Sequence, residues 1–253
     1  MKGLDFMKEK IYTIPITEIF EEECFCPFCK LFKRLSEEEI KYAIGPAMME
    51  PDYRAKTNEL GFCREHIKEL NSYPKALALS LVIDTHLDRI SNVFDTEFKK
   101  EKKSLFKKSD FKEDIENYLE ELNSFDSTCV ICEKVNYTFL RYLDTFCFMI
   151  DKDKDFLSKV LESDGFCIPH YTAILNALKR NVSSTKFIEL AEKLNALEKK
   201  KFSKYKSDVE AFIKSFDYHN AGKPLSVPSD TVLKSSYLLN GEFEKLNKKL
   251  DDI

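Results

Sequence analysis

The sequence predicts an all-α protein: two pseudo-repeats, each a helical hairpin closed by a metal site, followed by a long C-terminal helix. Three observations support this. The 253 residues include only 6 glycines and 8 prolines, with 33% charged residues, a balance that favours helices over turn-rich sheets and over disorder. Apolar residues recur at helical spacing, and no run shows the alternation of a strand. A pattern of cysteine and histidine occurs twice.

The first half of the chain predicts four main helices. Residues 11–20 are expected to be extended and then to form one helical turn. A helix follows from the first cysteines and stops at Gly45-Pro46, a shorter one covers about 52–60, and another starts after Gly61. The helix from Pro74 to about residue 98 is apolar nearly all round, which predicts a place in the middle of a bundle.

The second half starts after a lysine-rich stretch at 99–110, interpreted as a solvated linker. Helices are predicted at about 110–123, 129–149, 152–163 and 167–180. The segment after Ser183 predicts one helix of about 50 Å at ~1.5 Å per residue, followed by a loop and one or two short helices. We therefore expect modules at 1–108 and 109–181 and a C-terminal helical region at 182–253, which can pack as one globular unit.

The repeated pattern concentrates the cysteines and histidines. In each half a Cys-x2-Cys pair is followed, after 33 or 34 residues, by a Gly-Phe-Cys-x2-His segment, and the two copies are offset by 103 to 104 residues. The pattern takes up six of eight cysteines and two of four histidines. The predicted metal ligands are Cys26, Cys29, Cys63, His66, Cys129, Cys132, Cys167 and His170.

This ligand set matches structural zinc. A Cys-x2-Cys pair near a helix start places two sulfurs on one side of a turn, and a Cys-x2-His does the same with a sulfur and a nitrogen. Three thiolates and one imidazole form the closed tetrahedral set of structural zinc sites. Thiolates at helix N-termini are further stabilised by the macrodipole. The sequence therefore predicts two zinc ions.

The pairing of the motifs is expected to lie within each repeat. A helix of about 15 residues from Cys29 travels some 22 Å, and residues 46–62 are long enough to return over that distance. Each ion would then join the two ends of a helical hairpin. The other arrangement stays open, with the first Cys-x2-Cys meeting the second Cys-x2-His in crossed sites.

Other chemistry at the same residues is also considered. Iron–sulphur clusters are the alternative to zinc, because they also use thiolates and, in some cases, histidine. Redox dithiol chemistry fits less well, since no strand precedes "CPFC" and the second copy, "CVIC", lacks the proline. Haem attachment is disfavoured because neither Cys-x2-Cys is directly followed by histidine.

No catalytic constellation is found, and the sequence contains no glycine-rich phosphate loop or zinc-protease motif. Cys24 and Cys147 are expected to be unliganded. His86 and His219 are expected to be hydrogen-bonded core or surface residues, although an enzyme using "DTHLD" or "DYHNAGKP" is a third hypothesis. We expect a binding or scaffold protein rather than an enzyme.

Charge and hydropathy bear on partners and location. The net charge of -4 predicts no nucleic-acid partner. The N-terminus lacks the apolar stretch of a signal peptide, and the longest apolar run is too short to span a bilayer. We therefore expect a cytoplasmic protein with reduced thiols and no membrane partner, while a protein partner remains open.

The segments "CPFCKL", "EPDYRAKTNELGFCREHIKEL", "LALSLVIDTHLDRI", "CVIC" and "GFCIPHY" together resemble a bacterial family of unknown function that carries paired Cys-x2-Cys and Gly-Phe-Cys-x2-His motifs. The resemblance covers most of the chain. It implies the same eight ligands and no catalytic residue, and Cys24 is not part of the family pattern.

Overall fold

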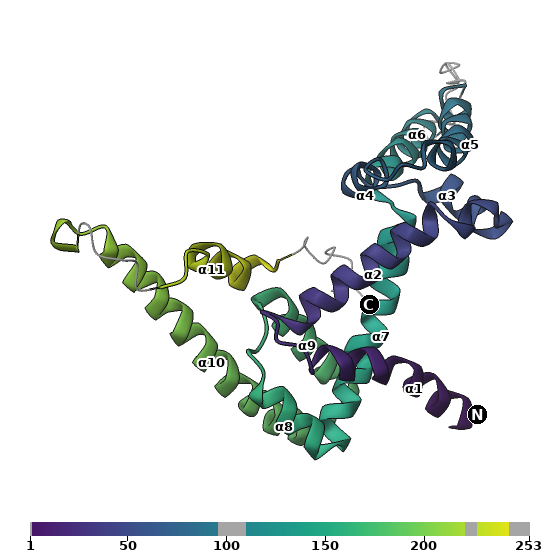
Figure 1. The fold of residues 1–253 in the computed structure, drawn as a ribbon. Helices are drawn as coiled ribbons and strands as arrows, with labels where there is room; N and C mark the ends of the chain where they lie inside the picture. Colours follow the sequence, from purple (N-terminus) through teal and green to yellow (C-terminus); the bar gives the residue numbers. More distant parts are fainter. Residues whose placement is uncertain (1, 96–109, 221–226, 243–253) are drawn as a thin grey trace. The chain divides into compact units, whose positions relative to one another are not determined.

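The computed structural model describes residues 2–95, 110–220 and 227–242, and in these ranges it contains helices and no strand (Figure 1). The predicted all-α class is confirmed. Apart from Asp110, the lysine-rich stretch predicted as a linker lies outside the described residues. Within them, no helix is long and apolar enough to cross a membrane.

Most neighbouring helices within the described ranges are joined by short connections, and most agree with the predicted spans. In chain order they are α1 (Lys2–Ile19), α2 (Pro27–Ala43), η1 (Pro46–Met49), α3 (Pro51–Leu60), α4 (Arg64–Leu70), α5 (Ala76–Phe94), α6 (Asp110–Ser127), α7 (Val130–Lys152), α8 (Lys154–Glu162), α9 (Ile168–Asn181), α10 (Ser184–Ser215), η2 (Tyr218–Asn220) and α11 (Thr231–Asn240). The single long helix predicted after Ser183 is α10, with 32 residues.

The chain divides into two compact units. The terminal unit comprises Met1–Arg34 and Thr138–Ile253, and the central unit comprises Leu35–Tyr137. The predicted division near residues 108 and 181 follows chain order, whereas these units join the N-terminal segment to the C-terminal half. Helices α2 and α7 each contribute residues to both units.

The core of the terminal unit is built largely of phenylalanine rings. Phe28, Phe139, Phe146 and Phe166 are among the largest fully buried side chains. The ring of Phe28 lies 5.1 Å from that of Phe146 and 5.8 Å from that of Phe166, centroid to centroid. The first pair is edge-to-face and the second is tilted, and such ring contacts add to the stabilisation from buried area. They hold the start of α2 against α7 and the loop before α9.

Helix α1 corrects the prediction of an extended segment at 11–20. The helix runs through Pro15, which removes one helical hydrogen bond. Ile16 and Ile19 are fully buried, and Phe20 stacks on Phe146 with centroids 5.7 Å apart. Burial of this apolar face offsets the cost of the proline, a tertiary effect that local propensity does not report.

Helix α5 corrects the prediction of a central bundle helix. It contacts α3, η1 and α6, and it buries Ala78, Leu79, Val82 and Val93. Leu77 is 76% exposed, Leu87 57% and Phe94 64%. The described part of the central unit covers only one side of this helix, so its all-round apolar sequence does not translate into all-round burial.

Candidate metal centres

The first Cys3His group lies in the terminal unit and consists of Cys26, Cys29, Cys167 and His170, whose ligand atoms all lie within 4.8 Å of one another. The Sγ of Cys167 is 3.8 Å from that of Cys26 and 3.7 Å from that of Cys29. His170 turns Nδ1 toward the sulfurs, at 3.1 Å from Cys167, 3.4 Å from Cys29 and 3.6 Å from Cys26.

Two helix N-termini position these four side chains. Cys26 directly precedes α2, which begins with Pro27, and Cys29 lies in its first turn. Cys167 is the N-cap residue of α9, and His170 lies in the first turn of that helix. All three thiols therefore lie at the positive end of a helix dipole, which favours the thiolate form needed for metal binding.

The first group is enclosed by apolar side chains. Cys29 and Cys167 are 0% exposed and His170 is 5% exposed. The rings of Phe139 and Phe28 lie 5.3 Å and 6.2 Å from the His170 ring. A backbone group also reaches the centre, because the N–H of Glu242 donates to Cys29 Sγ over 3.4 Å. Such an enclosed centre excludes water from the four ligand atoms.

Charge in the first group is concentrated on one sulfur. Burial raises the pKa of Cys26, but hydrogen bonding with the Cys167 and Cys29 thiols and the charge of His170 outweigh it and hold that pKa well below the ordinary thiol range. Hydrogen bonding to Cys167 and Cys26 raises the pKa of Cys29. The cluster thus favours at least one thiolate even before a cation binds.

The second Cys3His group lies in the central unit and consists of Cys63, His66, Cys129 and Cys132, again with all ligand atoms within 4.8 Å. The Nδ1 of His66 is 3.2 Å from the sulfurs of Cys63 and Cys132 and 3.4 Å from that of Cys129. The sulfurs of Cys63 and Cys132 are 3.7 Å apart.

Two backbone segments are joined directly beside the second group. The hydroxyl of Thr128 donates to the carbonyl of Leu60 over 2.7 Å, and the N–H of Val130 donates to the carbonyl of Gly61 over 3.1 Å. Cys63 is the N-cap residue of α4. These bonds bring the segment before Cys63 to the segment around Cys129, and so assemble both motifs.

The second group is less enclosed than the first. His66 and Cys129 are buried, whereas Cys63 and Cys132 are partly exposed. The outer nitrogen of His66, Nε2, lies 3.3 Å from the hydroxyl of Ser36. Such a partner on the outer ring nitrogen orients a histidine for metal binding through the inner one.

The second group also pairs thiolate with imidazolium. Hydrogen bonds from Cys129 and Cys132 lower the pKa of Cys63. Burial lowers the pKa of His66, but hydrogen bonds with Cys129 and Cys63 outweigh it and raise that pKa to about 10. A cation entering this group would replace the His66 proton, so binding would release protons.

All eight predicted residues come together in fours, but the expected pairing within each repeat is wrong. The structure has the crossed arrangement, in which the first Cys-x2-Cys meets the second Cys-x2-His. Helix α2 starts in the terminal unit and ends in the central unit, where residues 46–60 form η1 and α3 rather than a segment returning along α2. Cys63 therefore lies in a different unit from Cys29.

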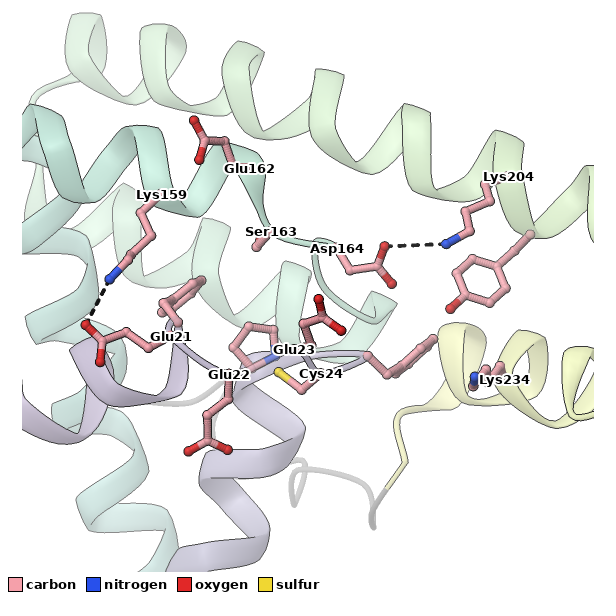
Figure 2. Close-up of a pocket in the computed structure, with 14 residues that line it drawn as sticks. Glu21, Glu22, Glu23, Cys24, Lys159, Glu162, Ser163, Asp164, Lys204 and Lys234 are labelled. Atoms are coloured by element: carbon pink, nitrogen blue, oxygen red, sulfur yellow. Dashed lines mark hydrogen bonds and ion pairs between the residues drawn. The ribbon is translucent and has the colours of Figure 1, made fainter. Parts of the chain in front are cut away.

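The remaining cysteines belong to neither group. Cys24 lies in a cavity of about 870 Å³ whose rim carries the ion pairs Lys159–Glu21 and Lys204–Asp164, at 3.1 and 3.7 Å (Figure 2). Burial raises the pKa of the Cys24 thiol to about 11. Cys147 is fully buried within α7, as expected of a core residue.

The other two histidines lie outside both groups. The Nδ1 of His86 is 2.9 Å from the carbonyl of Asn58, in agreement with the predicted hydrogen-bonded histidine. His219 is exposed, and its ring is tilted against that of Tyr218 with centroids 3.6 Å apart. Neither residue gathers further metal-ligating groups among the described residues.

Several residues that support the groups were not predicted. Ser36 beside His66, Glu198 beside the loop before Cys167, and the buried Lys201 lie on amphipathic helices. Their sequence context indicates only surface positions. One sequence feature could have indicated that Glu198 and Lys201 are buried: they lie three residues apart on the helix face that also carries the apolar leucines.

These features define an all-helical protein with two Cys3His groups that could each hold a metal ion. The chain belongs to a family of unknown function (DUF6062), and the sequence model of that family matches residues 7–246. The expected family resemblance is confirmed. No curated protein and no solved structure matches the chain.

Proposed function

We propose that the protein binds two structural zinc ions, one in each Cys3His group, and that the ions stabilise a helical binding or scaffold protein. The observation that carries this proposal is the convergence of four ligand atoms in each group from two segments far apart in sequence. In each group the histidine presents Nδ1 to all three sulfurs.

The distances match those around a single tetrahedral ion. With zinc–sulfur bonds of ~2.3 Å, neighbouring sulfurs of a tetrahedron lie about 3.8 Å apart, and a sulfur and a nitrogen about 3.6 Å apart. The sulfur–sulfur distances of Cys26–Cys167, Cys29–Cys167 and Cys63–Cys132 are 3.7 to 3.8 Å, the sulfur–nitrogen distances are 3.1 to 3.6 Å, and all ligand atoms of a group lie within 4.8 Å of one another. Each group thus has nearly the dimensions of a mononuclear site.

These dimensions favour zinc over an iron–sulphur cluster. A cluster places its protein ligands on different iron atoms, so its four ligand atoms lie farther apart than around one ion. The presence of four good protein ligands also leaves no open position for substrate or water, as a catalytic zinc requires. We therefore propose a structural role for both ions.

Each ion would fix the tertiary structure of one unit. The first group joins the start of α2 to the start of α9, and the second joins the start of α4 to the start of α7. Structural zinc can supply on the order of 10 kcal/mol of apparent folding free energy, comparable with the net stability of a domain.

Elemental analysis with a visible spectrum, on protein purified without oxygen, tests the proposal. We expect about two zinc ions per chain, no iron, no acid-labile sulfide and no sulfur-to-iron absorption. Removal of zinc by a chelator should lower the helical circular dichroism and the melting temperature. Iron with sulfide, or a metal-free chain with unchanged helicity and melting temperature, would refute it.

A further inference from the structure

We propose that the second Cys3His group is a site of reversible thiol oxidation, in which Cys63 and Cys132 form a disulfide and release the metal ion, while the first group keeps its own. This inference rests on the proposed metal binding. The two groups have the same ligand types, but we expect only the second to be oxidised readily and to lose its ion.

Access to the sulfurs distinguishes the two groups. In the first group, Cys26, Cys29 and Cys167 are all buried, at 1%, 0% and 0% exposure. In the second, Cys63 and Cys132 are both partly exposed, and only Cys129 is buried. A small oxidant dissolved in water therefore has access to two partly exposed cysteines of the second group, whereas all three cysteines of the first group are buried.

The distance between the sulfurs permits the reaction in the second group. The sulfurs of Cys63 and Cys132 are 3.7 Å apart, and a disulfide requires ~2.05 Å. Comparable pairs at 3.7 and 3.8 Å exist in the first group. Because both groups contain sulfurs at this separation, distance does not make one group react before the other. Cysteine oxidation also depends on exposure and thiolate character, and exposure is what differs between the two groups.

The position of Cys63 favours the required movement. It precedes α4, a helix of only 7 residues, and has an extended backbone. Cys167 holds the same position before α9, but the neighbouring Phe166 is fully buried within the phenylalanine core. By contrast, Phe62 before Cys63 is only partly buried and packs against a small cluster of Met48, Ala78 and Val82. A shift of the segment carrying Cys63 therefore disturbs a smaller apolar cluster than a shift of the segment carrying Cys167.

The chemistry balances with a peroxide as the two-electron oxidant. The sulfur of Cys63 attacks one peroxide oxygen, the O–O bond breaks, and a sulfenic acid forms while the other oxygen leaves as water after protonation. The sulfur of Cys132 then attacks the sulfenic sulfur and forms the S–S bond, and the hydroxyl leaves as a second water. The two sulfurs lose two electrons, and the metal ion loses two of its four ligands.

Hydrogen peroxide treatment of the zinc-loaded full chain tests the inference. The Cys24→Ser variant is used so that the thiol of Cys24 does not contribute. Zinc release is followed with a chromogenic indicator, and disulfides are located by mass spectrometry of peptides. We expect one zinc ion to leave at least ~10-fold faster than the other, a Cys63–Cys132 disulfide, and rebinding of zinc after reduction with a dithiol.

Two further variants assign the fast ion. Cys29→Ser removes a ligand from the first group and should retain the fast release, whereas Cys132→Ser should abolish it. Where a variant does not fold, the peptide map of the Cys24→Ser chain makes the same assignment. Release of both ions at one rate, or a first disulfide among Cys26, Cys29 and Cys167, would overturn the inference. A chain that binds no zinc at all would instead refute the proposed function.

Discussion

Glu198 accepts the backbone N–H of Phe166 through Oε1 over 2.8 Å. This bond fixes the loop immediately before Cys167 to the long helix α10. Glu198 is buried, and its second carboxyl oxygen, Oε2, has no hydrogen-bond partner in the structure. Glu198, which is not one of the eight Cys3His residues, thus holds the segment that carries Cys167. Burying its carboxyl group has a free-energy cost.

That carboxyl predicts a specific pH dependence. Burial raises the pKa of Glu198 to about 7, above its ordinary value of 4.5. Between these values the folded chain binds more protons than the unfolded chain, so ionisation of Glu198 lowers the free energy of unfolding as the pH rises. The Glu198→Gln substitution keeps the acceptor for Phe166 and removes this loss.

Urea unfolding of the zinc-loaded wild type and of Glu198→Gln at several pH values measures the effect. The variant should gain stability relative to the wild type as the pH rises through this window, by up to roughly 3 kcal/mol. Protonation of the metal ligands affects both proteins and cancels in the difference. Parallel stability profiles would show that Glu198 does not titrate in this way.

Gly61 and His86 lie so close together in the central unit that the effects of substituting them should be coupled. Its φ of +58° favours glycine, and a Cβ at this position would lie 2.5 Å from Nε2 of His86. Gly61→Ala should therefore lower the free energy of unfolding by about 1–3 kcal/mol. In a His86→Ala background the cost should fall by about 1 kcal/mol, because the clash disappears and only backbone strain remains. Additive effects of the two substitutions in chemical denaturation would contradict the coupling.

Substitution of the buried Lys201 should lower the free energy of unfolding substantially. It is 3% exposed, and its Nζ donates to the carbonyl of Phe25 over 2.6 Å, one residue before Cys26. Lys201→Met removes this donor and should cost about 2 kcal/mol in the free energy of unfolding. Lys204→Met, one turn along α10 and mostly exposed, is the matched control and should cost less than ~0.5 kcal/mol. Equal effects of the two substitutions would count against a role for the buried lysine.

Single ligand substitutions should each empty one group. Cys167→Ser is expected to lower the zinc content to about one ion per chain, and Cys132→Ser should do the same, because each removes one of four ligands. Cys24→Ser is the control and should keep both ions. Elemental analysis checks all three proteins, and loss of zinc in Cys24→Ser would make Cys24 a ligand.

The sequence predicted which eight residues gather in Cys3His groups better than it predicted their pairing. The spacing of Cys-x2-Cys and Cys-x2-His identifies four positions at helix starts in each half, and this is a local property. Whether Cys29 lies beside Cys63 or beside Cys167 depends on the path of residues 46–60. The length of this segment is compatible with both pairings. The structure resolves the choice because these residues form η1 and α3 within the central unit.

Burial was harder to predict than helix type. Helical spacing located α2, α7 and α10 well, because apolar periodicity is a property of a single segment. The same periodicity does not report what packs on the other side, so the exposure of Leu77 and Leu87 on α5 was missed. Burial of Glu198 and Lys201 on α10 was missed for the same reason.

Cadmium NMR shows directly which cysteines share one bound ion. Cadmium replaces zinc in thiolate sites and is visible by NMR, so through-bond correlations from each cadmium to cysteine β-protons identify its ligands. We expect two cadmium signals, one correlated with Cys26, Cys29 and Cys167 and the other with Cys63, Cys129 and Cys132. Correlation of one cadmium with Cys26, Cys29 and Cys63 together, or no bound cadmium, would contradict it.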